Sequence, residues 1–402
     1  MTTPPPAPSV YRFADCELDL LQFELRRGGE VVHVEPQVLD VLAYLIANRD
    51  RLVAKSELLD AVWGDRFVSE SALTSRLKEA RRAVGDDGQR QEVIATVHGR
   101  GYRFVAAVAE PSESNPPARA ESPIPQDIRY CVSPDGACVA YATAGEGTPL
   151  VKAANWLTHL ELEWESPIWS HWLHAFADRH RLVRYDERGC GLSDWEVEDF
   201  SFDAWVADLE LVVDAAGVDR FPLLGVSQGG AVAIAYAVRH PERVSHLILA
   251  GAYARGRMVR AESGAERDDA ALDLQAARVG WRRPDDAFRI AFASQFLPDG
   301  SRELWNSFIE LQRNTTSVDN FVRFLEIFAQ IDVADLAAKV SCPTLIIHAR
   351  GDTRVPQSQA RELAALIPDS RLVMLNSRSH ILTAAEPAWD VFLDEIDRFL
   401  GP

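Results

Sequence analysis

Three residues of this chain could together carry out nucleophilic catalysis: Ser227, Asp352 and His380. Ser227 is the centre of Gly225-Val226-Ser227-Gln228-Gly229, which follows an apolar run at 221–226 and precedes a helical pattern. A serine hydroxyl becomes a strong nucleophile when a histidine takes its proton and a carboxylate orients that histidine. Asp352 follows another apolar run, and His380 is the one histidine after it in the chain. We therefore predict acyl transfer through a Ser–His–Asp triad.

Strands that alternate with helices must position these three residues. The apolar runs predict strands at 150–154, 181–185, 221–226, 244–250, 344–349 and 371–375. Helical stretches separate most of them, and this alternation predicts a mostly parallel sheet covered by helices on both faces. Between residues 253 and 335 the strand pattern stops and helical patterns replace it, which predicts a helical insertion late in the sheet.

The helical insertion is rich in aromatic side chains. They are Trp281, Phe288, Phe292, Phe296, Trp305, Phe308, Phe321, Phe324 and Phe328. We expect most of them to pack the helices against one another. The remainder would line an apolar pocket over Ser227.

A second group of residues, near the N-terminus, could contact DNA. A helical pattern at 69–84 carries one apolar stripe, made of Leu73, Leu77, Ala80 and Val84. The other faces carry small polar and basic residues that we expect at the DNA: Ser71, Thr74, Ser75, Lys78, Arg81 and Arg82. Hydroxyl and lysine side chains can reach base edges in the major groove, and arginine can reach bases or phosphate. The alternative interpretation of this helix alone is a solvated face.

The segment after that helix favours the DNA interpretation. A hairpin is predicted at 93–97 and 102–105, and Arg100 lies between two glycines at its tip, where it could contact the DNA backbone or minor groove. Ahead of the helix, short alternating strands are predicted at 11–13, 16–19, 23–26 and 30–34, followed by helices at 36–48 and 55–63. These elements predict a small α+β domain over residues 1–109.

Composition and charge separate this domain from the rest of the chain. Residues 110–126 are rich in Pro, Ser and Glu without apolar periodicity, which predicts a linker between domains 1–109 and 127–402. The net charge is −18, but residues 66–103 hold 8 basic against 5 acidic side chains. An acidic protein with one basic patch is suited to DNA binding through that patch alone.

Several function classes are not expected from these residues. The sequence shows no signal peptide and no apolar run of about 20 residues, so we expect no membrane contact. Five cysteines without metal-ligand spacing predict reduced thiols in the cytoplasm. Cys131 and Cys138 flank a turn, and we consider two interpretations: a redox pair across a hairpin, or two small apolar residues. No dinucleotide fingerprint, P-loop or metal-ligand cluster occurs, so we expect neither cofactor nor metal.

The N-terminal domain resembles the OmpR/PhoB-type winged helix over about residues 10–106. The resemblance is carried by the runs Arg66-Phe67-Val68-Ser69-Glu70-Ser71-Ala72-Leu73 and Thr96-Val97-His98-Gly99-Arg100-Gly101-Tyr102. It implies double-stranded DNA as a partner, a recognition helix at 69–84, RNA polymerase contact through the loop at 64–68, and a homodimer on paired half-sites. No phosphoacceptor receiver domain precedes the wing in this sequence, so we do not expect control by phosphorylation.

The chain from about 128 to 400 resembles the α/β-hydrolase superfamily. The triad order, the insertion at 253–335 as its cap, and the segment 185–194 (D-x-R-G-x-G-x-S) carry the resemblance. Such a glycine-rich segment is expected to brace the site. The family usually has His-Gly ahead of the residue whose backbone N–H helps form the oxyanion hole, whereas this chain has Ala154-Asn155-Trp156. The implied oxyanion donors are the backbone N–H groups of Trp156 and Gln228, and the bulky Trp156 should narrow the pocket.

The sequence thus predicts two domains, a winged helix-turn-helix (α+β) followed by an α/β-hydrolase fold with a helical cap. Our leading hypothesis is a transcriptional regulator that senses, and can hydrolyse, a small apolar ester, lactone or other acyl compound. The first alternative is a serine esterase or lactonase whose DNA-binding domain controls only the expression of its own gene. The second alternative is a ligand trap that keeps the triad as a relic.

Overall fold

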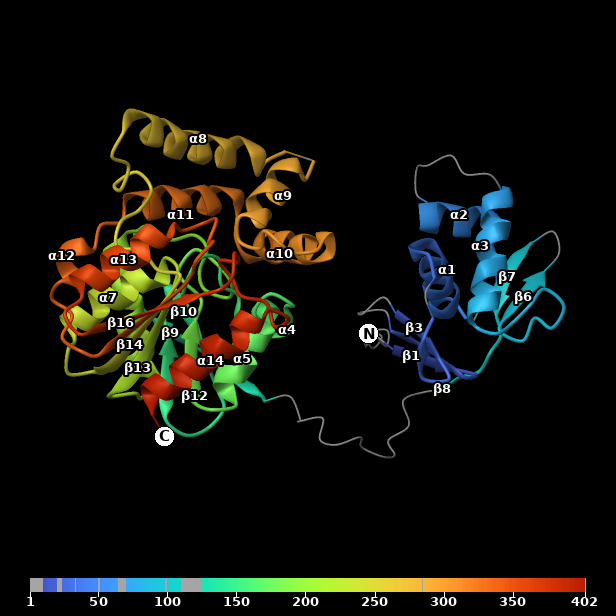
Figure 1. Cartoon of the computed structure of the whole chain (residues 1–402), viewed down its shortest axis with the longest axis horizontal. Helices are drawn as coiled ribbons and strands as arrows, with labels where there is room; N and C mark the ends of the chain where they lie inside the picture. The colour runs from blue at the N-terminus through green and yellow to red at the C-terminus, as the bar shows by residue number, and fades with distance from the viewer. Residues whose placement is uncertain are drawn as a thin grey trace. The chain divides into compact units, whose positions relative to one another are not determined.

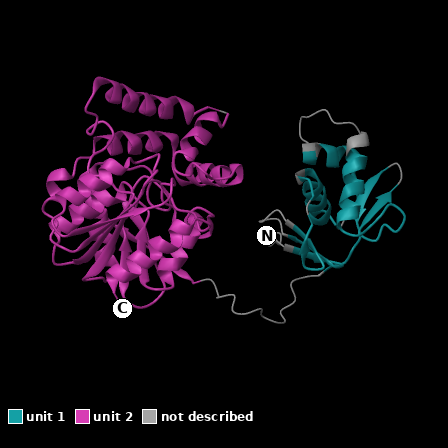
Figure 2. Ribbon diagram, viewed as in Figure 1, with its two compact units in different colours: residues 1–120 teal, residues 121–402 magenta. Residues whose placement is uncertain are grey.

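The structure is a computed structural model that describes residues 10–19, 24–32, 34–49, 51–63, 70–97, 100–109, 124–283 and 285–401. The chain divides into two compact units, residues 1–120 and 121–402 (Figure 2). Each unit encloses a hydrophobic core of its own. Most of the expected linker lies outside the described residues.

The N-terminal unit begins with the predicted antiparallel strands. They are β1 (Val10–Phe13), β2 (Cys16–Asp19), β3 (Glu24–Arg27) and β4 (Glu30–Val31). A fifth strand, β8 (Val108–Ala109), pairs with β1, so that the order in the sheet is β4-β3-β2-β1-β8. A strand of two residues carries too little alternation of apolar and polar side chains for the sequence pattern to predict it.

Three helices follow close to their predicted positions: α1 (Pro36–Ala47), α2 (Lys55–Trp63) and α3 (Glu70–Ala83). Pro36 suits the first turn of α1 because proline lacks the N–H that such a position leaves unpaired. The predicted apolar stripe of α3 is buried. Leu73, Leu77, Ala80 and Val84 are each at most 2% exposed.

The wing is a three-stranded sheet in the order β5-β7-β6, from β5 (Val53–Ala54), β6 (Ile94–Val97) and β7 (Gly101–Phe104). β5 was not among the predicted strands. Gly101 lies where β7 pairs with β5, at a φ of +151°, and a Cβ there would sit 2.0 Å from the Val53 carbonyl oxygen. Only glycine fits this close approach of two backbones.

Asp86 fixes the path from α3 to the wing. Its buried carboxylate accepts hydrogen bonds from the backbone N–H groups of Asp87, Glu92, Val93 and Ile94 at 2.8–3.0 Å. Burial alone would raise the pKa of Asp86, but these donors hold that pKa below its ordinary value. The charge of one side chain thus orients the wing relative to the helix before it.

The C-terminal unit is built on an eight-stranded sheet in the order β16-β15-β14-β13-β11-β12-β10-β9. The strands are β9 (Gln126–Val132), β10 (Cys138–Ala144), β11 (Pro149–Lys152), β12 (Arg181–Tyr185), β13 (Phe221–Val226), β14 (Val244–Ala250), β15 (Thr344–Ala349) and β16 (Ser370–Leu375). All pairings are parallel except β9 with β10 and β10 with β12. The six predicted strands and the mostly parallel sheet are confirmed, and β9 begins at the last residue of the expected linker.

Helices flank this sheet on both sides (Figure 1). They are α4 (Leu160–Glu165), α5 (Ser170–Ala177), α6 (Phe202–Ala215), α7 (Gly229–Arg239), α13 (Gln357–Leu366) and α14 (Pro387–Leu400). α5 and α14 pack together, with the rings of Trp172 and Phe392 4.6 Å apart. α7 packs on β13 and β14 and contacts α6, while α13 packs on β15 and β16. None of the helices in the described part of the chain has the length and apolar content of a membrane-crossing segment.

The predicted helical insertion is present between β14 and β15. It consists of α8 (Gly264–Gly280), α9 (Ala287–Ser294), α10 (Arg302–Thr315), α11 (Val318–Gln330) and the short α12 (Ala334–Ala337). α8 to α11 gather at one end of the unit as a cap (Figure 1). Serine N-caps start three of them: Ser263, Ser301 and Ser317 each accept a backbone N–H from the first turn.

Cys131 and Cys138 lie on the two strands of the β9–β10 hairpin but are not paired with each other. Cys131 pairs with Val139 and Cys138 pairs with Val132. Because neighbouring residues of a strand point to opposite faces, the two cysteines lie on opposite faces of the sheet. The redox interpretation is therefore wrong, and both act as small side chains with free thiols.

The segment 185–194 braces the unit through buried charges. Arg188 makes a bidentate pair with Asp208 of α6, at 2.7 Å from Nε to Oδ2 and 2.6 Å from Nη2 to Oδ1. A third bond joins Arg188 to Asp135 at 2.6 Å. In the same segment, Asp186 accepts the backbone N–H groups of Leu160 and Leu192. These contacts agree with the bracing role that the resemblance implies.

We expect Asp208→Asn to lower the free energy of unfolding of this unit by about 3 kcal/mol, because it removes the buried, bidentate carboxylate of a buried guanidinium and leaves only the bond to Asp135. The matched control on the same helix is Asp203→Asn, since Asp203 pairs with Arg239 but is 80% exposed; its effect should stay below about 1 kcal/mol. Urea unfolding followed by tryptophan fluorescence reports this unit, because every tryptophan except Trp63 belongs to it. Equal effects of the two substitutions would contradict the assignment.

Candidate active site

Ser227 occupies a sharp turn between β13 and α7. Its φ of +51° is in the left-handed region, which a serine adopts at a cost of about 1–3 kcal/mol. The flanking glycines allow this turn because the elements approach closely. A Cβ at Gly225 would lie 2.6 Å from the Cα of Gly230, and one at Gly229 would lie 2.5 Å from the Ala154 carbonyl oxygen.

The three predicted catalytic residues meet in one hydrogen-bonded chain. His380 Nε2 lies 2.9 Å from Ser227 Oγ, and His380 Nδ1 lies 2.7 Å from Asp352 Oδ2. Asp352 Oδ1 also accepts the backbone N–H groups of Arg354 and Val355 at 2.8 and 2.9 Å. Burial would raise the pKa of Asp352, but His380 and these donors hold that pKa below its ordinary value. The ionised carboxylate orients the ring, so that Nε2 can take the serine proton.

A second histidine, His348 of β15, lies beside the triad. Its Nε2 is 3.5 Å from Asp352 Oδ2 and 3.0 Å from the Val355 carbonyl oxygen. Burial lowers the pKa of His348, so its neutral form is favoured. The sequence pattern did not single out His348, because it falls within an apolar strand.

Of the two expected oxyanion donors, one backbone N–H is already hydrogen-bonded and, within the described part of the chain, the other is not. The backbone N–H of Trp156 donates to Oε1 of the Gln228 side chain at 3.1 Å. Nε2 of the same carboxamide donates to Oε1 of Glu187 at 3.1 Å. The backbone N–H of Gln228, at the start of α7, has no hydrogen-bond partner among the described residues. One expected donor is thus open and the other is engaged by the protein itself.

Glu187 underlies this arrangement. The carboxyl is completely buried, and burial, with a contribution from Asp208, raises the pKa of Glu187 to about 8. A carboxyl group with this pKa is mostly protonated at neutral pH. The sequence pattern did not identify Glu187 or the side-chain role of Gln228, because both act through contacts between distant segments.

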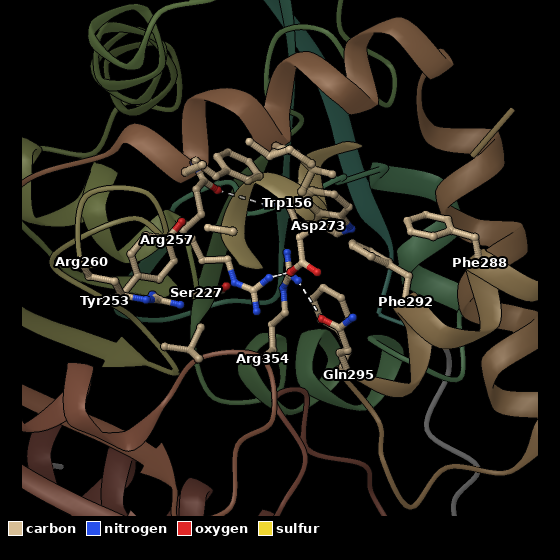
Figure 3. A pocket seen from close by; sticks show the side chains of 18 residues that line it. Trp156, Ser227, Tyr253, Arg257, Arg260, Asp273, Phe288, Phe292, Gln295 and Arg354 are labelled. Carbon is tan, nitrogen blue, oxygen red and sulfur yellow. Dashed lines mark hydrogen bonds and ion pairs between the residues drawn. The ribbon is translucent and has the colours of Figure 1, made fainter. Parts of the chain in front are cut away.

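A pocket of about 810 Å³, including its open mouth, lies over Ser227 (Figure 3). Four of the nine expected cap aromatics line it: Phe288, Phe292, Phe296 and Phe328. Trp156 closes one side, with its ring 5.6 Å from that of Phe292 and 5.7 Å from that of Phe328. This packing agrees with the prediction that Trp156 narrows the pocket.

Three arginines also line the pocket, and the sequence pattern did not point to them. Arg257 and Arg260 come from the segment after β14, and Arg354 comes from the loop that carries Asp352. Asp273 is the one acidic residue in the same lining, and it pairs with Arg257. The sequence could not reveal this group, because its members are separated by almost a hundred residues of cap.

The residues predicted at the DNA belong to α3 and the wing. The side chains of Thr74, Ser75, Lys78, Arg82 and Arg100 are exposed. The side chain of Ser71, the loop at 64–68 and residues 98–99 at the hairpin tip lie outside the described residues.

Arg81 has contacts within its own unit. It donates to the Ile94 carbonyl oxygen at 2.8 and 3.0 Å and to Thr96 Oγ1 at 2.8 Å. Its guanidinium therefore ties α3 to β6, which favours a positioning role over a direct DNA contact. Elsewhere, no group of three or more metal-ligating side chains occurs within the described ranges.

The chain belongs to the α/β hydrolase fold family, whose model matches residues 162–384. A second model, for the C-terminal part of transcriptional regulatory proteins, matches residues 29–104. The N-terminal unit is thus an OmpR/PhoB-type DNA-binding domain, and the chain joins it to a hydrolase domain.

Known relatives resemble the hydrolase domain. One is the "Putative carbamate hydrolase RutD" of Azorhizobium caulinodans, 26% identical over 65% of this chain and 94% of that protein. Another is the pyrrolizixenacetamide deacetylase of Xenorhabdus hominickii, 29% identical over 60% of this chain and 86% of that protein. Among solved structures, a hydrolase from Pseudomonas aeruginosa PA01 superposes with a TM-score of 0.56 and 25% identity over 69% of this chain and 99% of its own.

We expect a fluorophosphonate probe to label the wild-type protein at Ser227 and not to label Ser227→Ala. Asp352→Asn should lower the labelling rate by about 10³–10⁴-fold, because the histidine loses its required tautomer. Labelling is followed by gel fluorescence and by mass spectrometry of the modified peptide. The control is Ser294→Ala, a cap hydroxyl that bonds within its own helix; it should label like the wild type. Undiminished labelling of His380→Ala would show that His380 is not the base.

Proposed function

We propose that this protein is a transcriptional regulator whose hydrolase domain binds and hydrolyses a small ester, lactone or other acyl compound. Occupancy of that domain would set the affinity of the N-terminal domain for DNA. We further propose that it acts in the cytoplasm as a homodimer and that the loop at 64–68 contacts RNA polymerase.

The observation that carries this proposal is a complete triad in the same chain as a DNA-binding domain. With Nε2 of His380 2.9 Å from Ser227 Oγ, the serine can attack an acyl carbon while its proton passes to His380. The leaving alcohol or amine then takes that proton, and water hydrolyses the acyl-serine ester to an acid by the reverse use of the same histidine.

The alternative function is a serine esterase or lactonase whose DNA-binding domain controls only its own gene. The hydrogen-bonded triad favours it, because a domain that only trapped ligands would gain nothing from an oriented base. The alternatives differ in whether occupancy of the pocket changes DNA binding. A ligand can shift that binding only if it prefers one state of the protein over another.

Lys78→Ala and Arg82→Ala should each weaken binding to a selected DNA site by about 1–3 kcal/mol if they contact bases. If Arg100 contacts only phosphate, Arg100→Ala should weaken binding to all sequences alike, since a phosphate contact carries no sequence information. The measurement is fluorescence anisotropy of the full chain at several salt concentrations, on a duplex selected from a random library. Arg12→Ala is the control, because Arg12 is exposed on β1 and pairs with Glu17 of β2. Unchanged affinity in all three variants would contradict the assigned DNA face.

Covalent occupancy of Ser227 by a fluorophosphonate should change the affinity of the full chain for that duplex by roughly 5–150-fold, the usual range of coupling between sites. The treated and untreated wild-type proteins are compared with Ser227→Ala treated in the same way. If the labelled protein binds DNA like the unlabelled one, the sensor proposal fails and the esterase alternative replaces it.

A further inference from the structure

We propose that the pocket over Ser227 selects an acyl compound that also carries an ionised carboxylate, and that Arg354 and Arg260 hold this carboxylate. The inference rests on the proposed function of the same site and adds the charge of its ligand. It replaces the purely apolar ligand that the sequence predicts.

The pocket carries an excess of positive charge. Its lining contains three guanidinium groups and the single carboxylate of Asp273, which pairs with Arg257. Arg354 donates to the neutral side chain of Gln295 at 2.9 Å, and Arg260 donates to the Arg255 carbonyl oxygen at 3.3 Å. Neither forms an ion pair with a carboxylate in the described part of the chain.

The protein holds these charges at a cost. Burial, together with the nearby charges of Arg257 and Arg260, lowers the pKa of Arg354 to about 9. Burial and Arg257 also lower the pKa of Arg260. Shifts of this direction mean that the surroundings destabilise the charged forms, although a group with a pKa of about 9 stays protonated at neutral pH. A ligand carboxylate would supply the missing counter-charge with charge-assisted hydrogen bonds.

Arg354 is positioned to act on a bound ligand. Its backbone N–H bonds to Asp352, and its side chain projects into the pocket beside Ser227 (Figure 3). The guanidinium lies over the rings of Phe292 and Phe296, 5.0 and 5.1 Å from their centroids. Stacking of this kind fixes the plane of the guanidinium while its N–H groups stay available at the edge.

A neighbouring hollow shows why the anion belongs over Ser227. That hollow shares Arg257, Arg260 and Arg354 with the pocket, but carboxylates also line it: Glu262, Glu266, Asp269, Asp352 and Glu362. In the neighbouring hollow these carboxylates offset the positive charge of the three arginines. In the pocket over Ser227 the only carboxylate in the described lining is that of Asp273, so an excess of positive charge remains there. The carboxylate would therefore sit at the arginines, with the apolar body against Phe288, Leu325 and Phe328.

The test compares two esters of equal chain length that differ in charge. The mono-p-nitrophenyl ester of glutarate should be hydrolysed with a kcat/KM at least about tenfold above that of p-nitrophenyl pentanoate. This factor corresponds to the usual free energy of a hydrogen bond to a charged group. Arg354→Gln and Arg260→Gln should each lower kcat/KM for the glutarate ester by roughly 10–100-fold. Both variants should lose more of their kcat/KM for the glutarate ester than for the pentanoate ester, and their urea unfolding transitions show whether they fold.

Arg255→Gln is the matched control. Arg255 lines the neighbouring hollow but not the pocket over Ser227, and it pairs with Glu362 and Asp332. This variant should hydrolyse both esters like the wild type. A preference for the pentanoate ester, or a glutarate preference that survives in both Arg354→Gln and Arg260→Gln, would overturn the inference. Faster hydrolysis of the corresponding 4-phosphonobutanoate ester would overturn the choice of a carboxylate in favour of a phosphate-like group.

Failure of the proposed hydrolysis is separable from failure of this inference. If neither ester is turned over and Ser227 is not labelled by the fluorophosphonate, the catalytic part of the proposed function is wrong. Calorimetry on full-length Ser227→Ala with monomethyl glutarate and methyl pentanoate then decides the inference. Binding of the glutarate ester that weakens in S227A/R354Q supports it, and absence of such binding overturns it.

Discussion

The left-handed backbone of Ser227 is the constraint on which the rest of the hydrolase domain depends. Such a conformation persists only where its surroundings leave no alternative. Here a side chain has no room at Gly225, which meets α7, at Gly229, which meets the backbone after β11, or at Gly230, which meets Ala252 after β14. Backbone geometry therefore fixes the position of Ser227, the proposed nucleophile. The loops after β15 and β16 place the Asp352 carboxylate and the His380 imidazole beside it.

Charge inside this domain follows two patterns. In the segment that braces the fold the charges are paired, as in the bidentate contact of Arg188 with Asp208. Beside Ser227, Arg257 pairs with Asp273, but the hydrogen-bond partners of Arg354 and Arg260 among the described residues are neutral. A folding role explains the first pattern and not the second, since partly buried cations without carboxylates lower the stability of a protein unless something else binds them. This contrast supports the proposal that Arg354 and Arg260 lower the stability of the folded domain but provide a binding site for an anion.

The sequence predicted the architecture and the triad because both depend on local signals. Periodicity located the strands, and the chain order of the α/β-hydrolase family that the sequence resembles assigned Asp352 and His380 as partners of Ser227. Short strands such as β8 carry too little pattern to be seen. Glu187, Gln228 and the pocket arginines were missed for another reason: their roles arise when segments distant in the chain meet. Arg81 shows a second limit of sequence patterns. Helical spacing predicted a contact between Arg81 and DNA, whereas the hydrogen bonds of its guanidinium turn the side chain toward β6.

The engagement of Trp156 by Gln228 has a consequence for how the protein can register what it binds. An amide oxygen of the protein itself already accepts a hydrogen bond from the backbone N–H of Trp156, one of the two expected oxyanion donors. An incoming carbonyl that takes this donor must displace the Gln228 side chain, whose other end is hydrogen-bonded to the buried Glu187. The resting carboxamide is thus an internal competitor for the substrate. Displacement of the Gln228 side chain would therefore transmit the presence of a bound ligand from the pocket to the buried carboxyl group of Glu187. This change would occur before any bond of the ligand is broken.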